Sequence, residues 1–227
     1  MEETKTGSLV RLGALLSEPA RARMLLSLMN GQRRPASELA RLGKVTPQTA
    51  SGHLKLLVEG GALKMTPYGR HRYYGLASES WAEILESVMG LDGVQALPAL
   101  ADAPLARARL CYRHLAGTLG VAWAEGLERE RCLEGAGARM RLSGRGEESL
   151  RPAGQLDADE ALTGLTAKPC LDWTERRHHL AGPLANTLTR RMLERRWLLP
   201  SRGSRVLLPT LEGERRLRRL GVQLPSG

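Results

Sequence analysis

The chain has 227 residues, enough for one large domain or two ordinary domains with a substantial core. Its formal net charge of +10 and its pI near 10.2 favour a polyanionic partner. Phe is absent while Leu, Ala and Arg are abundant, which predicts a mainly α protein with small β wings. The odd number of cysteines argues against a disulfide scaffold, and the lack of a long apolar run argues against a membrane span. The charged start Met1-Glu2-Glu3 is unlike a signal peptide, so we expect a cytoplasmic protein.

Two helices are expected in the first 31 residues of the chain. The first covers Thr6 to Leu16 and is amphipathic, because its leucines recur at helical spacing: Leu9, Leu12, Leu15 and Leu16. The second starts at Pro19 under a Ser17 cap and ends near Asn30-Gly31. Its core side is expected to carry Met24, Leu25 and Leu28.

The next stretch predicts two short helices joined by a tight turn. The first runs from a Ser37 cap to Leu42, and Gly43 ends it in a left-handed conformation. Thr46 caps the second, with Pro47 at the first position, where no N–H is needed. The second helix is expected to stop at Gly60-Gly61 and to turn four residues to the core: Ala50, Leu54, Leu57 and Val58.

A basic hairpin follows, since residues 63–65 and 72–74 alternate as strands around a turn at 68–70. Helix, turn, helix and hairpin make a winged helix-turn-helix. The polar side of its second helix is free of acids that would repel phosphate, and the tip of the hairpin is basic. The alternative is an ordinary solvated face. The DNA contacts predicted from this pattern are Thr46, Gln48, Thr49, Ser51, Gly52, His53, Lys55, Arg70, His71 and Arg72.

The segment from about Leu9 to Leu76 resembles the DNA-binding domain of the ArsR/SmtB family of bacterial repressors. The matching motifs are SEPAR at 17–21, SGHLK at 51–55 and the Gly69-Arg70 wing. The resemblance covers about a third of the chain. It implies a helical homodimer that binds a palindromic operator on double-stranded DNA and releases it when an inducer binds.

A fifth helix, also amphipathic, is expected at Ser80 to Met89, where the resemblance implies pairing across the dimer axis. The stretch after it is rich in Gly, Pro and Ala and short of charge, which is typical of a linker. We therefore expect a DNA-binding and dimerisation domain at 1–95, a linker at 96–104 and a C-terminal sensor domain at 105–227.

The C-terminal half repeats itself at an interval of about 65 residues, longer than solenoid repeats. HLAG occurs at 114–117 and at 179–182, each time followed by a helix, a short strand and a Gly-x3-Leu-x3-Gly pattern. These repeats, about 105–160 and 165–227, predict two helix–helix–strand–helix units with the order of a degenerate winged helix. The alternative is an irregular helical bundle in which HLAG is only a turn.

Cysteine and histidine gather around the two HLAG motifs. If the first motif is helical, Cys111 and His114 share one helix face and form half of a tetrahedral metal site. If the repeats pack with two-fold symmetry, Cys111 and Cys170 come close and could bind a thiophilic metal or metalloid, or act as a redox couple. The bland alternative is that the cysteines are packing residues, as expected for Cys132, and that the imidazoles are ordinary hydrogen-bonding groups.

The segment 170–182 concentrates acid, base, Trp and imidazole, so an effector pocket lined by Asp172, Trp173, Arg176 and His179 is one interpretation and a salt-bridged amphipathic helix is the other. The candidate effector residues are Cys111, His114, Cys170, Asp172, Trp173, His178 and His179. CYRHLAG and CLDWTERRHHLAG resemble a longer-chain subgroup of ArsR-type regulators, in which an acid stands where this chain has Arg113. That departure weakens a carboxylate–histidine pairing at His114.

The best-known metal sites of the resembled family are missing. The predicted first helix of the helix-turn-helix contains no Cys-x-Cys, and the predicted dimer helix contains no His. No cofactor is therefore expected for DNA binding. A metal or a thiol-reactive compound remains the candidate effector, acting at a different place.

Arginine is frequent in the last third of the chain. The set at 190, 191, 195 and 196 could add phosphate contacts on one helix, or could pair locally with neighbouring acids.

The sequence favours a DNA-binding transcriptional regulator, a repressor released by an effector that the C-terminal half senses. The alternative is a redox or metal-binding protein that uses Cys111 and Cys170, with the winged helix as an interaction module. No phosphate-cradling Gly loop, GxSxG elbow or paired acids beside a reactive group occur, which argues against an enzyme.

Overall fold

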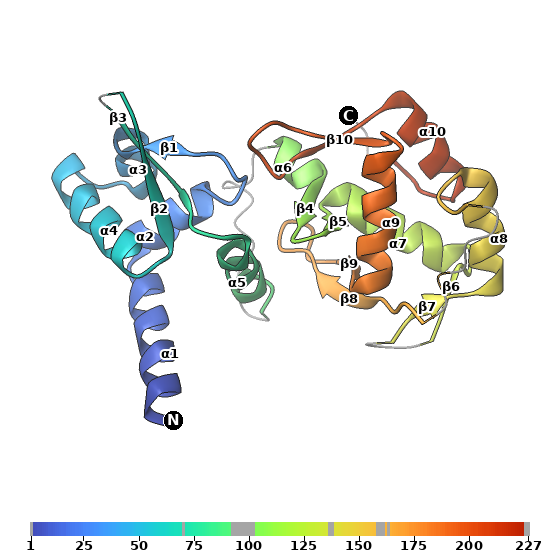
Figure 1. Ribbon diagram of the computed structural model, residues 1–227, viewed down its shortest axis with the longest axis horizontal. Helices are drawn as coiled ribbons and strands as arrows, with labels where there is room; N and C mark the ends of the chain where they lie inside the picture. The colour runs from blue at the N-terminus through green and yellow to red at the C-terminus, as the bar shows by residue number, and fades with distance from the viewer. Residues whose placement is uncertain are drawn as a thin grey trace. The chain divides into compact units, whose positions relative to one another are not determined.

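The computed structural model describes residues 2–69, 71–91, 103–135, 139–157, 162 and 164–224. The chain forms two compact units, Met1–Leu85 and Glu86–Gly227, coloured blue to green and green to red in Figure 1. The division falls within helix α5 (Glu79–Met89), which matches the helix expected there. It precedes the domain end predicted at residue 95, and the predicted linker at 96–104 lies largely outside the described residues. Among the described helices, none combines the length and apolar composition that crossing a lipid bilayer needs.

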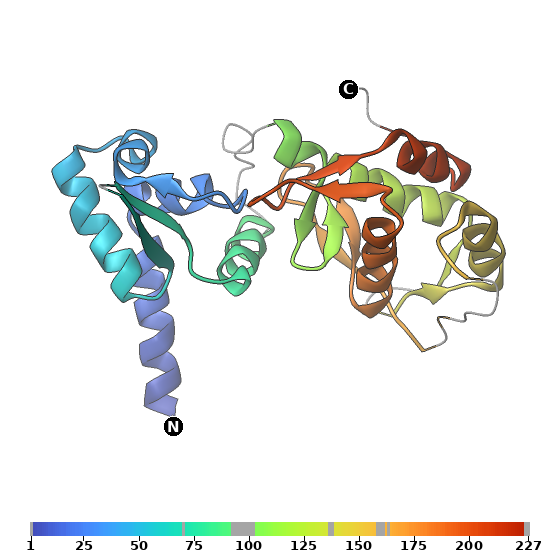
Figure 2. The same cartoon turned by 45° about the horizontal axis from the view of Figure 1, so that its top comes forward.

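The first unit is a winged helix-turn-helix, as the sequence predicts. Its helices are α1 (Glu2–Leu16), α2 (Pro19–Ser27), α3 (Ala36–Gly43) and α4 (Pro47–Glu59). An antiparallel sheet of order β1-β3-β2 completes it, with β1 (Arg34–Pro35), β2 (Leu63–Tyr68) and β3 (His71–Leu76). Figures 1 and 2 show the β2–β3 hairpin beside α4, which follows from the contact of β2 with the end of that helix.

The capping of α4 is confirmed, whereas the predicted caps of α2 and α3 are wrong. The Thr49 N–H donates to Thr46 Oγ1 at 3.2 Å, and Pro47 occupies the first turn. Glu18, not Ser17, caps α2 by accepting from the Ala20 N–H at 3.3 Å. Ser37 lies inside α3, which begins after Pro35 without a side-chain cap. An extended proline sets the chain direction there, so the helix starts at Ala36, two residues earlier than a Ser37 cap would allow.

Gly43 has a different role from the one predicted. It is the last residue of α3, and Lys44 takes the left-handed conformation with φ 57°. A Cβ on Gly43 would lie 2.7 Å from Met24 Cε, so the missing side chain lets α3 pack closely on α2. On α4, Ala50, Leu54 and Leu57 are buried as expected, but Val58 is 36% exposed because it lies about 100° around the helix from Leu57.

Helix α1 exists as predicted, but its apolar side chains are not all covered. Leu9 is 68% exposed and Val10 is 65% exposed, while Leu12, Leu15 and Leu16 are half-buried. The apolar face predicted for this helix is therefore left open at Leu9 in the single chain. Met24, Leu25 and Leu28, in contrast, are fully buried as predicted.

The second unit contains one order of elements twice, after the short helix α6 (Ala103–Arg107). The first segment is β4 (Arg109–Cys111), β5 (His114–Ala116), α7 (Thr118–Arg129), β6 (Leu133–Glu134), β7 (Arg141–Leu142) and α8 (Gly144–Ala153). The second is β8 (Lys168–Leu171), β9 (His178–Ala181), α9 (Pro183–Glu194), β10 (Leu198–Pro200), β11 (Leu207–Pro209) and α10 (Leu211–Arg219). Consecutive strands in each segment pair antiparallel.

The residues before each HLAG motif form a strand rather than the predicted helix. Cys111 and His114 face each other across a two-residue turn in which Tyr112 has φ 58°. HLAG itself is the second strand of a hairpin plus a glycine that starts the next helix: Gly117 has φ 81° and Gly182 has φ 93°. The predicted helix–helix–strand–helix unit is therefore wrong in its first element, and the degenerate winged-helix interpretation is not confirmed.

The Gly-x3-Leu-x3-Gly pattern has a physical explanation that is the same in both segments. Gly146 donates its N–H to the Ser143 cap of α8, and Gly213 donates to the Thr210 cap of α10, each at 3.0 Å. A Cβ at Gly146 would lie 2.2 Å from the Cys132 carbonyl oxygen, and one at Gly213 would lie 2.1 Å from the Trp197 carbonyl oxygen. The central leucine of each pattern is fully buried, and the last glycine has positive φ: Leu150, Leu217, Gly154 and Gly221.

The two segments exchange packing partners. Helix α7 packs on β9, α9 packs on β5, and β5 lies beside β9 (Figure 1). The Leu115 N–H of β5 donates to Thr189 Oγ1 of α9 at 3.0 Å. One core joins both segments, built around buried side chains such as Trp123, Leu115, Leu180, Leu188 and Trp197. The inner hairpins β4–β5 and β8–β9 are thereby held together at the centre of the unit.

Replacing Gly146 by Ala should destabilise the second unit by about 1–3 kcal/mol, because the new Cβ overlaps a backbone carbonyl that cannot move without shifting the end of α7. Gly144→Ala in the same helix is the matched control, since its Cβ meets nothing within 4 Å, and it should change stability by less than about 0.5 kcal/mol. Urea unfolding followed by fluorescence of the buried tryptophans measures both. Equal stability of the two variants would contradict this packing.

Candidate functional site

Helix α4 exposes a polar face that carries no acidic residue from Pro47 to Val58. Gln48, Thr49, Ser51, Gly52 and Lys55 are all exposed. Thr46 Oγ1 lies 2.9 Å from Thr49 Oγ1, so the capping turn holds both hydroxyls at the start of the helix. Lys55 Nζ lies 3.8 Å from Glu59 Oε1, an exposed pair that leaves the ammonium available to solvent. Such a face fits the major groove in size and charge.

The other predicted DNA contacts divide into two groups. His71 and Arg72 are exposed on β3, next to the wing turn, and Arg70 lies outside the described residues. His53 is half-buried, and its Nδ1 lies 3.4 Å from Arg21 Nη1 of α2. The structure therefore places His53 toward α2 rather than on the exposed face of α4.

In the second unit, two cysteines and two histidines meet. Cys111, His114, Cys170 and His179 each offer one ligand atom, and these atoms all lie within 4.8 Å of one another. His114 Nε2 and His179 Nε2 are 3.1 Å apart. Cys111, His114 and His179 are buried and Cys170 is half-buried. We call these four residues the Cys–His cluster.

The two thiols of the Cys–His cluster differ in proton affinity. A hydrogen bond from the Cys111 thiol lowers the pKa of Cys170, and hydrogen bonds to His114 and His179 lower it further. The same hydrogen bond, together with burial and the charge of Glu86, raises the pKa of Cys111. Cys170 is therefore the thiolate and Cys111 the proton donor of the pair. Burial disfavours a charged His179, but hydrogen bonding to Asp172 and Cys170 raises its pKa to about 9.

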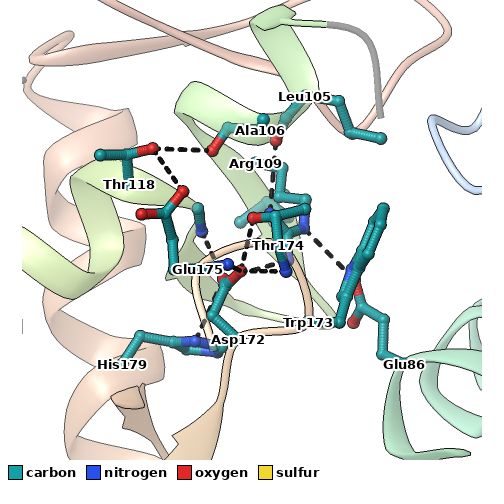
Figure 3. Close-up of polar contacts among 12 residues, drawn as sticks. Glu86, Leu105, Ala106, Arg109, Thr118, Asp172, Trp173, Thr174, Glu175 and His179 are labelled. Carbon is teal, nitrogen blue, oxygen red and sulfur yellow. Dashed lines mark hydrogen bonds and ion pairs between the residues drawn. The ribbon is translucent and has the colours of Figure 1, made fainter. Parts of the chain in front are cut away.

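Asp172 lies behind His179 and has no exposed surface (Figure 3). Its Oδ2 lies 3.4 Å from His179 Nδ1, accepts from the Gly117 N–H at 2.7 Å and from Arg109 Nη2 at 3.0 Å. Its Oδ1 accepts from the Thr174 hydroxyl at 2.6 Å and from two backbone N–H groups. Burial opposes ionisation of this carboxyl, but these donors outweigh it and hold the pKa of Asp172 far below its usual range.

Arg109 connects Asp172 to helix α5. Its guanidinium is fully buried, and its Nε lies 3.4 Å from Glu86 Oε1. Trp173 lies against the guanidinium, with the Arg109 Cζ 5.0 Å from its ring centroid, and donates its Nε1–H to Glu86 Oε1 at 3.3 Å (Figure 3). Arg205 Nη1 also reaches Glu86 Oε1 at 3.2 Å. Burial raises the pKa of Glu86, but Arg205 and Arg109 reverse this and lower it overall.

Three comparisons with known proteins bear on this geometry. A family model described as a helix-turn-helix domain matches residues 16–66. The chain is 35% identical over 212 residues to the HTH-type transcriptional regulator YdfF of Bacillus subtilis (strain 168), covering 91% of this chain and 94% of YdfF. It is 34% identical over 94 residues to the HTH-type transcriptional regulator CmtR of Mycobacterium tuberculosis (strain ATCC 25618 / H37Rv), covering 40% of this chain and 79% of CmtR. Among solved structures, the homodimeric winged helix-turn-helix domain of a possible ArsR-family regulator from Mycobacterium bovis matches 38% of this chain and 80% of its own, with 26% identity and a TM-score of 0.36.

The chain belongs to the ArsR family of helix-turn-helix transcriptional regulators. The similarity to YdfF extends through the second unit, whereas the similarity to CmtR covers 40% of this chain. This ArsR-family regulator therefore shares both of its units with a regulator of similar length.

The candidate effector residues of the regulator are only partly brought together. Cys111, His114, Cys170 and His179 converge, whereas His178 is exposed on β9 beside the buried His179. Asp172 and Trp173 do not line a pocket, because both are buried and their polar atoms are used within the unit. Arg176 donates to the carbonyl oxygens of Met89 and Leu91. These contacts do not support the effector-pocket interpretation of Asp172, Trp173 and Arg176, which stays a prediction, and Cys132 is part of the core.

Two buried, charged neighbours of the Cys–His cluster, Glu86 and Arg109, are not predicted from the sequence. Neither residue belongs to a recognisable motif, since Glu86 is one acid on an amphipathic helix and Arg109 is one of many arginines in a basic chain. The only signal is weak: Arg109 stands between apolar residues in a short strand. The structure favours local pairing over phosphate contact for the arginines near residue 190. Arg190 pairs with Glu194, Arg195 pairs with Asp157, and Arg191 is buried.

Arg109→Met should destabilise the second unit by about 3–5 kcal/mol, because Asp172 and Glu86 would both lose a buried cation. Arg190→Met is the matched control, since its partner Glu194 is exposed, and it should cost no more than about 1 kcal/mol. Urea unfolding followed by circular dichroism gives both values. A small loss for Arg109→Met would mean that the carboxylates are not held by this cation.

Proposed function

We propose that this regulator is a homodimeric repressor that binds a palindromic operator with α4 and its wing, and that an effector sensed by the second unit releases it. The observation that carries the proposal is the exposed, acid-free face of α4 at Gln48, Thr49, Ser51, Gly52 and Lys55. Amides and hydroxyls on that face can bond to base edges, while Arg72 and His71 of the wing can bond to phosphate. A DNA partner supports a location in the cytoplasm.

The exposed apolar side chains of α1 support a dimer. Leu9 and Val10 are each about two-thirds exposed, on a helix that lies outside the helix-turn-helix core. Adjacent exposed apolar residues of this size favour contact with a second copy of the chain. Two copies would present two α4 helices to successive turns of the duplex, which requires an operator with two half-sites.

Gln48→Ala should weaken binding to the regulator's own promoter by about 1–3 kcal/mol while leaving binding to random DNA nearly unchanged, because the amide contacts base edges only. Arg72→Ala is the contrasting variant and should weaken both complexes alike and reduce the salt dependence by about one ion. Fluorescence anisotropy with both DNA fragments at several salt concentrations separates the two. Parallel losses for Gln48→Ala on both DNAs would argue against base recognition by α4.

Leu9→Glu should convert the dimer to monomers and reduce operator affinity, because a carboxylate on α1 cannot be buried against a second copy without a partner. Leu211→Glu is the matched control, since Leu211 is 76% exposed on α10 of the second unit, and it should leave the dimer intact. Sedimentation velocity gives the oligomeric state. A dimer that survives Leu9→Glu would place the interface elsewhere.

A further inference from the structure

The Cys–His cluster is assembled from two equivalent cross-strand pairs. Cys111 is the register partner of His114 in the β4–β5 hairpin, and Cys170 is the register partner of His179 in the β8–β9 hairpin. The connections differ in length. Two residues separate Cys111 from His114, whereas eight residues, 171–178, separate Cys170 from His179 and form what we call the β8–β9 excursion. Each hairpin nevertheless presents one sulfur and one imidazole to the other, because β5 and β9 lie side by side.

We propose that Cys111, His114, Cys170 and His179 form a tetrahedral site for one divalent cation of the zinc class, and that this cation is the effector of the regulator. Zn²⁺ binds thiolate at about 2.3 Å and imidazole at about 2.0–2.1 Å, so two imidazole nitrogens on one ion lie roughly 3.3 Å apart. His114 Nε2 and His179 Nε2 are 3.1 Å apart, and all four ligand atoms are within 4.8 Å of one another. Small side-chain shifts convert this arrangement into a closed S2N2 coordination sphere.

The surroundings of the cluster favour a cation over a simple polar core. Two thiols and two imidazoles whose ligand atoms all lie within 4.8 Å of one another are the donor set of a tetrahedral zinc site. A cation at their centre would bind all four donors at once, in place of the hydrogen bonds that now join them. Asp172 Oδ2 lies 3.4 Å from His179 Nδ1, the atom on the opposite side of the ring from Nε2. A carboxylate in that place orients an imidazole for metal binding and raises its basicity. Asp172 is a positioning residue in this arrangement.

The donor set also defines the chemical class of the ion. Two thiolates and two imidazoles suit Zn²⁺, Co²⁺ and Cd²⁺, whereas Mg²⁺ and Ca²⁺ require oxygen ligands. Cys111, His114 and His179 are buried while Cys170 is half-buried, so the cation has an approach from the Cys170 side. Binding releases the Cys111 thiol proton and the Nε2 proton of a charged His179 to solvent, because thiolate and neutral imidazole are the ligands.

The effector role rests on the proposed function and follows from the chain of contacts behind the cluster. Asp172 joins His179 to Arg109, and Arg109 joins Asp172 to Glu86 of α5 (Figure 3). Helix α5 begins at Glu79, within the unit that carries α4. A cation that fixes His179 therefore fixes a buried network ending on the helix that continues into the DNA-binding unit. Ligand and operator are coupled if that helix differs between the free and the bound state.

Co²⁺ titration of the full-length, reduced protein tests the site directly. We expect one equivalent per chain, with the intense visible absorption of tetrahedral Co²⁺ and thiolate-to-metal charge transfer, displaced by one equivalent of Zn²⁺. Cys111→Ser and Cys170→Ser should each lower Zn²⁺ affinity, measured with a competing chelator, by at least about 100-fold. The matched controls Cys132→Ser and His178→Ala change a cysteine and a histidine outside the cluster and should bind as the parent does.

Asp172→Asn tests the positioning role. It retains all four ligands, so the tetrahedral Co²⁺ spectrum should remain while affinity falls by about 10–100-fold. Circular dichroism verifies that each variant is folded. Absence of the spectrum in the parent protein, or binding that the two cysteine changes leave intact, would overturn the site. A Cys111–Cys170 disulfide in place of cation binding would show that the thiols are a redox pair and would overturn it equally.

Operator affinity measured with and without one equivalent of Zn²⁺ tests the effector role separately. A change of at least about fivefold in the parent protein, lost in Cys170→Ser and kept in Cys132→Ser, supports it. Tight Zn²⁺ binding with unchanged operator affinity would overturn the effector role and leave a structural cation. Failure of the cation-free protein to prefer its own promoter would instead refute the proposed function, while the Co²⁺ spectrum would still decide the site.

Discussion

The buried charge of Asp172 is the constraint on which the second unit depends. A carboxylate without exposed surface is costly unless donors surround it. Thr174 in the β8–β9 excursion is a local donor to Asp172, whereas Arg109 of β4 and Gly117 before α7 come from the other hairpin segment. Satisfying one side chain thus brings the two inner hairpins into a fixed relation. The Cys–His cluster exists because that relation places β5 against β9.

Much of the first unit follows from local chemistry, and local chemistry is visible in a sequence. Thr46 followed by Pro47 caps and starts a helix whatever the rest of the chain does, and Gly60-Gly61 ends it. Prediction of the first unit from sequence fails where one residue type can serve two structural roles. Gly43 could end a helix by its conformation, but it was required for the approach of Met24, and only the packing of α3 on α2 distinguishes the two roles.

The second unit shows the opposite case, in which one spacing suits two structures. Residues three apart share a helix face, and they are also register partners across a two-residue turn, so Cys111 and His114 were correctly paired but placed on the wrong element. The residues around Cys111 and His114 do not by themselves distinguish a helix from a hairpin. The packing of α9 on β5 favours the hairpin, and this tertiary contact cannot be seen in the local sequence. The two Gly-x3-Leu-x3-Gly patterns can be seen in the sequence because the first glycine of each faces a carbonyl oxygen and the last has positive φ, which are strict local requirements. Arg109 was invisible because its partners are supplied by the tertiary fold.

The same network explains how a cation at the proposed site could regulate DNA binding as well as stabilise the second unit. Among themselves the four donors are held by a thiol proton and imidazole hydrogen bonds, which are weaker and less directional than coordination. A cation bound to His179 would add positive charge beside Asp172 and so change the electrostatic potential at Arg109 and Glu86, which are joined to Asp172 by buried ion pairs. In a buried network such a change is weakly screened, so it is transmitted to Glu86 rather than lost to solvent. Because α5 carries Glu86 and begins in the unit that holds α4, the buried network behind the cluster ends on a helix that starts in the unit proposed to bind DNA.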